Sequence, residues 1–363
     1  MTNKKRVAVW GTGNVGRPAI RAVVANKHLE LAAVIVANPK KVGLDAGEIA
    51  SIANTGIKAT DDWQQVLSQN IDAVVYTATA DTRPEAAYTE LFACLNAGIN
   101  VVSTSFYPFL YPKSAPQELM DMANASCTKG NSSLFVSGID PGWAMDIIPI
   151  ILSGMSADIS EIRCQEVFNY ALYDQPDVVR NVIGFGLTME QLPPMLQEFS
   201  LKMVWEPMVR MIGDGLDNPV DEVITQVERR PLEQTIQVAG MGQFDKGTQG
   251  AFRFEVKGMV NGVARYVVEH ITRIDNRCAP DWPYPGEGHG CHQLKITGSP
   301  CLNVSMHAED PNEPGPAGGG NATAANRVVN AITAVCDAEA GVVTPLDLPL
   351  ISGGAQLRTA SKQ

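Results

Sequence analysis

The feature that most constrains this chain is a glycine-rich loop between a strand-like and a helix-like segment near its start. The β-branched run Arg6–Trp10 stops at Gly11-Thr12-Gly13-Asn14-Val15-Gly16, and helical sequence follows from Arg17 to about Ala25. Glycines in this order let the backbone turn tightly and approach a pyrophosphate, while unpaired N–H groups at the helix start attract negative charge. The pattern predicts that residues 11–16 bind a dinucleotide; the alternative is a glycine-rich turn without a ligand.

The segment after the second predicted strand bears on which dinucleotide is bound. Leu31–Val36 has the pattern of a strand, and an enzyme that uses NAD is expected to carry Asp or Glu at its end for the ribose 2′-hydroxyl. This chain has Ala37-Asn38-Pro39-Lys40-Lys41 there. Two lysines and no carboxylate suit a 2′-phosphate, so we predict NADP (NADPH) rather than NAD, with Asn38, Lys40 and Lys41 as ligands. The alternative is that both lysines belong to a solvated loop.

Strands and helices continue to alternate through the first third of the chain. Asp72–Thr77, Asn100–Thr104 and Leu134–Ser137 have the pattern of strands, and Glu85–Ala97 that of a helix. This α/β alternation predicts a doubly wound parallel sheet, a Rossmann domain over residues 1–140. Ligands of such sheets bind beyond the carboxyl ends of the strands. That rule adds to the predicted cofactor site Thr77, Ala78, Thr79, Ser103 and Thr104.

The pattern changes after Gly138. A turn rich in Pro and Gly leads into the apolar helix Ile147–Leu152, and strand-like segments follow at 159–170, 234–239 and 250–274. The last of these contains Asn261-Gly262, the strongest short signal for a hairpin. We predict a second α+β domain, residues 141–310, with a mixed or antiparallel sheet that covers the cofactor cleft or a partner subunit.

Two further segments are helical by pattern. Met189–Met211 is predicted as a helix broken at Pro193-Pro194 and at Pro207. Residues 310–320 are rich in Pro and Gly and are predicted as a loop, and Ala322–Ala338 has helical spacing. We expect residues 321–363 to form a C-terminal helix and tail that return to the Rossmann domain.

Composition limits the possible partners. The formal net charge of −11 argues against nucleic acid, since phosphate contacts need clustered Lys and Arg. No apolar stretch approaches the roughly 18 residues that a bilayer requires, so no membrane is expected. Seven scattered cysteines are typical of free thiols, and with no visible targeting segment they favour the cytoplasm.

Several motifs spread over nearly the whole chain resemble the dihydrodipicolinate reductase-like dehydrogenases, the group that includes 2,4-diaminopentanoate dehydrogenase and the native amine dehydrogenases. The motifs are the Gly11–Arg17 loop, Val42–Glu48, Gly138–Asp146, Asn169–Tyr173, Glu269–Arg273 and Ala325–Ile332. The resemblance implies an NAD(P)-dependent oxidoreductase that acts on a small molecule at a C–N or C=O centre, often as a homodimer through the second domain.

The chain departs from that group at two places. Dihydrodipicolinate reductases carry a histidine pair and a lysine where this chain has Glu166-Val-Phe-Asn169-Tyr170, which argues against the lysine-pathway reaction. Amine dehydrogenases of the group place a glutamate shortly after the fifth strand to handle ammonia or the iminium. Here Ser103–Tyr111 contains no carboxylate.

Hydride transfer to a carbonyl or imine needs a group that polarises or protonates the acceptor. The resemblance places around the cleft Tyr107, Tyr111, Tyr170, Tyr173 and His270, and we take Tyr107, Tyr170, Tyr173 and His270 as catalytic candidates. Trp143, Glu166 and Asn169 are candidates for the substrate pocket, with Glu166 as a possible replacement for the missing carboxylate. Each also has a purely structural explanation, because tyrosines in sheets are commonly packed rings. His289-Gly-Cys291-His292 has zinc-type residues but no evident fourth ligand, so we expect no metal.

Three hypotheses remain for function. The first is an NADP-dependent reductase or dehydrogenase of a ketone, imine or amine with an apolar substituent. The second is reductive amination of small ketones with ammonia. The third, of another class, is a dinucleotide-binding sensor that transfers no hydride.

Overall fold

The computed structural model describes residues 4–173, 175–313 and 316–357. The chain divides into two compact units: unit 1 comprises Met1–Gly138 and Asn321–Gln363, and unit 2 comprises Ile139–Gly320. Unit 1 is therefore assembled from two separate stretches of chain, and unit 2 from the stretch between them. The end of the expected C-terminal tail, residues 358–363, lies outside the described residues.

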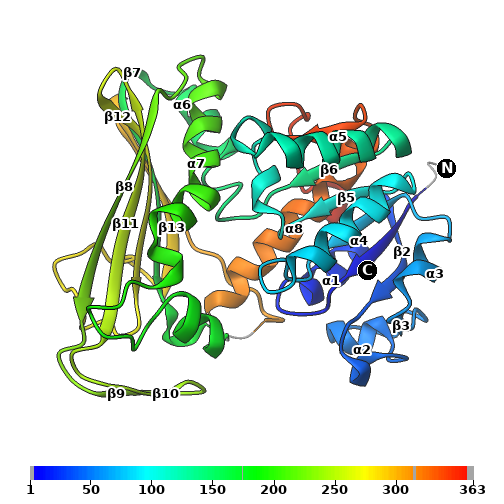
Figure 1. Ribbon diagram of the computed structural model, residues 1–363, viewed down its shortest axis with the longest axis horizontal. Helices are drawn as coiled ribbons and strands as arrows, with labels where there is room; N and C mark the ends of the chain where they lie inside the picture. The colour runs from blue at the N-terminus through cyan, green and yellow to red at the C-terminus, as the bar shows by residue number, and fades with distance from the viewer. Residues whose placement is uncertain (1–3, 174, 314–315, 358–363) are drawn as a thin grey trace, which may run out of the picture. The chain divides into compact units, whose positions relative to one another are not determined.

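Unit 1 contains a seven-stranded parallel sheet in the order β15-β6-β5-β4-β1-β2-β3 (Figure 1). The chain winds outward from β1 in one direction through β2 and β3, and from β4 in the other direction, so the strand order reverses between β1 and β4. This arrangement confirms the predicted doubly wound α/β fold. The strands are β1 (Lys5–Trp10), β2 (Leu29–Ile35), β3 (Ala59–Thr60), β4 (Ala73–Tyr76), β5 (Asn100–Ser103), β6 (Ser133–Val136) and β15 (Gly341–Val343).

Helices cover both faces of the unit 1 sheet. The inward-facing valines of β1, β4 and β5 pack against α1 and α8, where Ile20 and Ile332 are fully buried. The helices α4 and α5 lie side by side on the other face (Figure 1). The helices that contribute to unit 1 are α1 (Gly16–Ala25), α2 (Ala46–Ala50), α3 (Trp63–Leu67), α4 (Pro84–Asn96), α5 (Gln117–Gly130) and α8 (Pro316–Cys336).

Unit 2 is built on a six-stranded sheet in the order β14-β13-β7-β12-β11-β8. The pair β7 and β12 is parallel and the other pairs are antiparallel, which confirms a mixed sheet. The helix α7 lies along one face of this sheet, against β11 and β12 (Figure 1). The elements are α6 (Ile147–Ser153), β7 (Ala157–Asn169), α7 (Glu198–Gly215), β8 (Glu222–Pro231), β11 (Gln249–Val260), β12 (Val263–Arg273), β13 (Gly290–Ser299) and β14 (Leu302–Met306), with a small separate hairpin, β9 (Ile236–Val238) and β10 (Gly242–Phe244).

The predicted hairpin at Asn261-Gly262 joins β11 to β12. Val260 pairs with Val263, and both turn residues have positive φ, 51° for Asn261 and 75° for Gly262. A two-residue turn with this backbone matches the twist of its flanking strands, which is why Asn-Gly is favoured there.

Two helix boundaries differ from the sequence-based predictions. The predicted break at Pro207 is wrong: α7 begins only at Glu198, after the two prolines, but then continues through Pro207. Pro207 is buried, so the packing of α7 against the sheet compensates for the hydrogen bond that a proline cannot donate. The helix α8 begins at Pro316, inside the predicted loop 310–320. A Cβ on Gly319 would lie 1.9 Å from the Ala308 carbonyl oxygen, and a Cβ on Gly318 would lie 2.3 Å from the Glu313 carbonyl oxygen. These two glycines therefore permit close backbone packing at the start of the helix.

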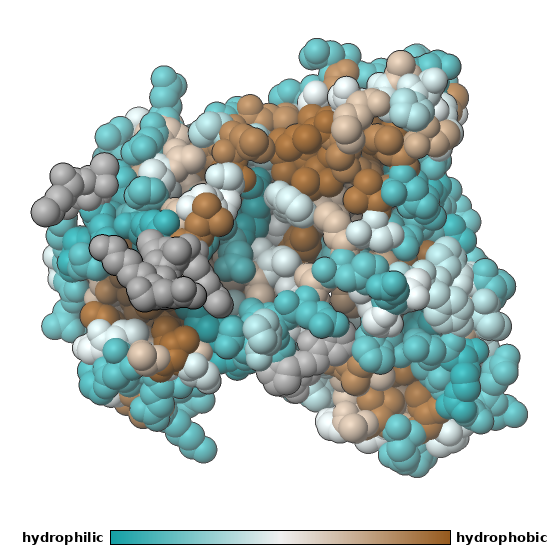
Figure 2. All heavy atoms as spheres, turned by 180° about the vertical axis from the view of Figure 1, so that it is seen from behind, coloured by the Kyte–Doolittle hydropathy of each residue, from teal (hydrophilic) through white to brown (hydrophobic). Residues whose placement is uncertain are grey.

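None of the helices in the described part of the chain combines the length and apolar character needed to cross a bilayer. On the face shown in Figure 2, polar residues are interspersed with separate apolar patches. The exposed large apolar side chains include Phe199 and Leu350, which are 75% and 78% exposed.

Candidate active site

The glycine loop of unit 1 has one open position and two closely packed ones. Gly11 has φ +99°, and a Cβ on Gly16 would lie 2.1 Å from the Gly11 carbonyl oxygen. A Cβ on Gly13 would meet nothing within 4 Å. The first and third glycines are thus required by the fold itself, while the space above Gly13 suits the close approach of a dinucleotide phosphate.

The end of β2 places a lysine on this loop. The Asn38 side chain accepts a hydrogen bond from the Lys40 N–H and so caps the short turn Pro39–Lys41. The Lys41 ammonium donates to the Thr12 carbonyl oxygen at 2.8 Å and to its hydroxyl at 3.2 Å. Burial lowers the pKa of Lys41, and neighbouring Arg17 acts in the same direction. Lys40 is exposed.

The remaining predicted cofactor residues gather at the carboxyl ends of adjacent strands. Thr77 follows β4, and its hydroxyl donates to the Trp10 carbonyl oxygen at 3.1 Å, next to the glycine loop. The Ser103 hydroxyl donates to the Tyr76 carbonyl oxygen at 2.8 Å. Because β1, β4 and β5 are neighbours and parallel, one edge of the sheet brings together residues 11–16, 77–79, 103 and 104.

Unit 2 contains a buried row of titratable side chains. Glu166 on β7 pairs directly with His270 on β12 and with His292 on β13, so the three side chains lie side by side on one face of the sheet. His270 Nδ1 lies 3.5 Å from Glu166 Oε1, and His292 Nε2 lies 3.6 Å from Glu166 Oε2. All three residues are buried. The row is a product of strand register, which a single sequence does not reveal.

Asp140, in the turn after the Rossmann strands, extends the row at the His270 end. Its Oδ2 lies 2.9 Å from His270 Nε2, and its Oδ1 accepts a hydrogen bond from Trp205 Nε1 at 2.8 Å. The His270 ring stacks on Phe254, with centroids 4.4 Å apart, and meets the edge of Trp205 at 4.7 Å. The aromatic rings thus fix the imidazole between the two carboxylates.

Two tyrosines lie beside Glu166 in the middle of the row. The Tyr170 hydroxyl donates to Glu166 Oε1 at 2.8 Å, and the Tyr170 and Tyr173 rings stack with centroids 5.0 Å apart. Burial, with the Glu166 charge, raises the pKa of Tyr170 far above its ordinary value and that of Tyr173 to about 12. Both tyrosines are therefore neutral hydrogen-bond donors at physiological pH.

The electrostatics of the row distinguish its two carboxylates. Burial raises the pKa of Asp140, although His270 acts in the opposite direction. Burial also acts to raise the pKa of Glu166, but the two histidines and the Tyr170 hydroxyl outweigh it and bring the value to about 2. Burial opposes charge on His270, yet Asp140 and Glu166 raise its pKa. Glu166 is therefore ionised, and the Asp140–His270 pair retains a proton more readily than either group does in water.

Three atoms of this cluster are buried without an aligned hydrogen-bond partner among the described residues: Asp140 Oδ2, His270 Nε2 and His292 Nε2. Each is a position at which a bound molecule can donate or accept a hydrogen bond. Asp140, Glu166 and His270 also offer oxygen and nitrogen atoms within 4.8 Å of one another, a spacing compatible with a metal ion. The same donor set suits a protonated nitrogen equally well, because carboxylates accept hydrogen bonds from ammonium groups.

Other sequence candidates lie elsewhere. Tyr107 belongs to unit 1, in the turn Tyr107–Phe109, and not to the cluster. Trp143 is half-buried in unit 2. The Asn169 side chain hydrogen-bonds Asn276 and the Ala171 N–H rather than the cluster. Asp140, His292 and Trp205 were not among the candidates; Asp140 stood in a quoted motif, but nothing in the sequence pairs it with His270.

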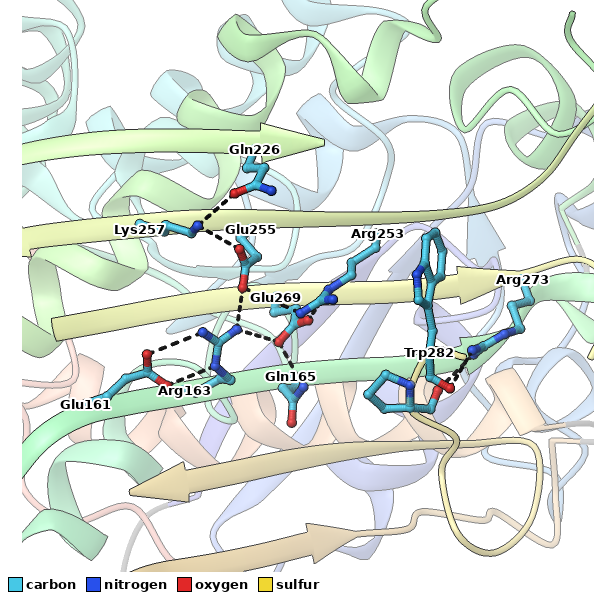
Figure 3. A network of polar contacts seen from close by, with 11 residues as sticks. Glu161, Arg163, Gln165, Gln226, Arg253, Glu255, Lys257, Glu269, Arg273 and Trp282 are labelled. Carbon is cyan, nitrogen blue, oxygen red and sulfur yellow. Dashed lines mark hydrogen bonds and ion pairs between the residues drawn. The ribbon is translucent and has the colours of Figure 1, made fainter. Parts of the chain in front are cut away.

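The other face of the same sheet carries a separate ionic network (Figure 3). Glu269 is fully buried and accepts hydrogen bonds from Arg163 at 2.7 Å, Arg253 at 2.5 Å and Gln165 at 2.8 Å. The zinc-like run His289–His292 divides between the two faces, because the Cys291 thiol contacts the Pro285 carbonyl oxygen while His292 faces Glu166. Its side chains therefore do not converge.

Two family models match the chain. Residues 5–107 match the N-terminus of dihydrodipicolinate reductase, and residues 143–360 match the C-terminal domain of 2,4-diaminopentanoate dehydrogenase. The second match spans more than half of the chain and contains Glu166, Tyr170, His270 and His292.

Complete relatives agree with these matches. The chain is 47% identical to an amine dehydrogenase of Streptomyces virginiae over 94% of its own length and 95% of that protein. It is 23% identical to the 2,4-diaminopentanoate dehydrogenase of Acetoanaerobium sticklandii over 96% and 94% of the two chains.

Among solved structures, an amine dehydrogenase from Mycobacterium smegmatis has the same fold, with a TM-score of 0.73 at 20% identity and coverage of 97% and 98%. GenD2 of gentamicin A biosynthesis, solved with NAD, gives a TM-score of 0.55 at 15% identity and coverage of 96% and 90%. The relatives are dehydrogenases, which identifies the chain as an enzyme rather than a sensor. The chain belongs to the family of 2,4-diaminopentanoate dehydrogenase and amine dehydrogenase, and it is an oxidoreductase that binds a nicotinamide dinucleotide.

Proposed function

We propose that this enzyme is an NADP-dependent amine dehydrogenase, which interconverts a small ketone plus ammonia and the corresponding amine. When bound, the reduced dinucleotide supplies the hydride. Unit 1 holds that cofactor through residues 11–16, 38–41, 77–79 and 103–104, and unit 2 supplies the polar groups that bind the reacting nitrogen.

The observation that carries this proposal is the charge of the buried cluster in unit 2. The cluster places two buried carboxylates, Asp140 and Glu166, on either side of His270, and Glu166 is ionised. A buried charge without a counterion is costly, and a cationic nitrogen would compensate for it. The cluster therefore favours ammonium or a protonated amine over a neutral ketone alone.

The choice of NADP rests on the end of β2. Lys41 is a cation held on the glycine loop, and the described residues 37–41 include no carboxylate to bind a 2′-hydroxyl. A lysine at this position attracts a 2′-phosphate more strongly than it attracts the 2′-hydroxyl of NAD.

Ammonium dependence is the decisive test. NADPH oxidation is measured with a panel of small ketones bearing apolar substituents, each with and without ammonium chloride, and with sodium chloride at equal ionic strength as the control. We expect oxidation only when ammonium and ketone are both present. Equal rates without ammonium would instead assign the enzyme to plain carbonyl reduction.

The proposal extends to the setting of the enzyme. We place Tyr170, Tyr173 and His270 in the amine site with Glu166, leave Trp143 and Asn169 as pocket residues and Tyr107 as a candidate on unit 1, and assign no metal. We propose that unit 1 binds the cofactor, with the returning helix and tail as part of it, and that unit 2 binds the substrate and forms the dimer. We further propose a homodimer in the cytoplasm, which light scattering of the purified protein and cell fractionation test directly.

A further inference from the structure

We infer that Asp140 is the acid–base residue of this enzyme, and that together with His270 it delivers the proton that removes the carbinolamine hydroxyl as water. This inference rests on the proposed amine dehydrogenase function and deepens it. It supplies a carboxylate in a chain whose segment Ser103–Tyr111 has none.

The two carboxylate oxygens of Asp140 differ in their surroundings. Its Oδ1 is occupied by Trp205 Nε1, whereas Oδ2 is buried and has no aligned hydrogen-bond partner among the described residues. His270 Nε2, 2.9 Å away, is unaligned as well. Such atoms are costly to bury unless something completes their hydrogen bonding. A hydroxyl or amino group of a bound substrate intermediate would do so at Oδ2.

The neighbours of His270 hold its imidazole in a position from which it can exchange a proton with Asp140. Glu166 lies at its other nitrogen, and Phe254 and Trp205 hold the ring in place. An imidazole fixed between two carboxylates can pass a proton from one nitrogen side to the other, so His270 and Glu166 are positioning and relay residues for Asp140. The Asp140–His270 pair holds a proton above the ordinary pKa of each member, which supports this geometry. The titratable groups around His270 are Asp140, Glu166, His292, Tyr170 and, on the opposite face of its own strand, Glu269.

The chemical step balances with groups already named. Ammonia adds to the ketone to give a carbinolamine, which carries the hydroxyl and the amino group on one carbon. The proton of the Asp140–His270 pair passes to that hydroxyl, the C–O bond breaks with its electrons leaving on water, and the nitrogen lone pair forms the C=N bond of the iminium. The pair is then one proton short, and solvent restores it through Glu166 and His270.

Two substrates separate this step from the rest of the reaction. A ketone with ammonium requires the dehydration, whereas a preformed N-methyl cyclic iminium salt requires only the hydride and has no N–H proton to lose. We expect Asp140→Asn to lower kcat for ketone amination about 100-fold, the scale of general acid catalysis, and to change iminium reduction less than fivefold. Asp217→Asn is the matched control, since Asp217 is exposed in unit 2 and its φ of 52° is one that Asn tolerates.

The rates of Asp140→Asn with the two substrates decide whether Asp140 is the acid. Retention of ketone amination by Asp140→Asn overturns the inference, and so does equal loss of both reactions in a variant that still melts at the wild-type temperature and binds NADPH. Absence of ammonium-dependent turnover in the wild type is a different result, because it removes the proposed function before any variant is made.

A second variant covers a folding failure of Asp140→Asn. Asp140→Glu keeps the acid, and we expect it to recover at least a tenth of the wild-type amination rate.

In the wild-type enzyme itself, the rate of amination should fall at alkaline pH as the Asp140–His270 pair loses its proton, while the rate of iminium reduction should not. His270→Gln removes one of the two groups that share this proton, so we expect the pH of the alkaline fall to change for amination and not for iminium reduction. An identical alkaline fall for both substrates contradicts the inference.

Discussion

The proposed choice of NADP depends on one residue, Lys41, which follows β2 and contacts the glycine loop. Lys41 donates to both oxygens of Thr12, which orients its ammonium at the place where the sequence lacks the carboxylate typical of NAD enzymes. The residue types at this turn could be read from the sequence. Its contact with Thr12 could not, because it depends on how β2 ends beside the loop.

Replacing Lys41 tests its role in cofactor choice. We expect Lys41→Ala to raise the KM for NADPH about tenfold, the effect of losing one hydrogen bond to a charged group, and to change the KM for NADH less than twofold. The exposed Lys27 at the far end of α1 provides the control, Lys27→Ala. Equal changes for both coenzymes would show that Lys41 only supports the loop.

The glycines of the loop separate stability from binding. Gly16→Ala places a Cβ 2.1 Å from a backbone oxygen and should destabilise the protein by about 2–3 kcal/mol. Gly13→Ala meets no protein atom, so we expect an unchanged melting temperature and NADPH binding weakened about tenfold, or about 1.4 kcal/mol. Thermal melts and fluorescence titrations of both variants measure this. Wild-type affinity in Gly13→Ala would argue against the predicted phosphate position.

At the scale of elements, short sequence motifs predict single turns and strands well, but they do not show which distant strands pair with one another. The glycine loop, the Asn261-Gly262 turn and the parallel sheet follow from short patterns of residues. The row Glu166, His270 and His292 does not, because strands separated by about a hundred residues must be aligned before their side chains meet. Pro207 shows the opposite limit: a local helix breaker was outweighed by the burial of α7 against the sheet.

The ionic network on β7, β11 and β12 gives the element-scale prediction (Figure 3). Glu269 is fully buried and bridges Arg163 and Arg253, so Glu269→Ala removes the buried partner that the two cations share and should cost about 2–3 kcal/mol, although both keep Glu255. Lys202→Ala breaks the exposed pair with Glu198 and should cost less than about 1 kcal/mol. Urea unfolding of the two variants makes the comparison. Similar midpoints would mean that solvent screens the Glu269 network as fully as the surface pair.

For the whole molecule, the decisive feature is that unit 1 is discontinuous in sequence. Its sheet is completed by β15, which pairs with β6, and its core by Val328 and Ile332 of α8. The alternation of strands and helices predicted the first part of this unit. The pairing of β15 with β6 joins residues about two hundred positions apart, and no local pattern predicts it.

Shortened chains test this organisation. A protein made of residues 4–138 joined by a flexible Gly/Ser linker to 321–357 should fold and bind NADPH, because it contains the complete sheet and the glycine loop. At an NADPH concentration 100 times its Kd, we expect stabilisation of about 2.7 kcal/mol. Residues 4–138 alone leave the apolar face that α8 covers exposed to water and should aggregate. Soluble, NADPH-binding protein from residues 4–138 alone would mean that the C-terminal helix and strand are dispensable for the cofactor fold.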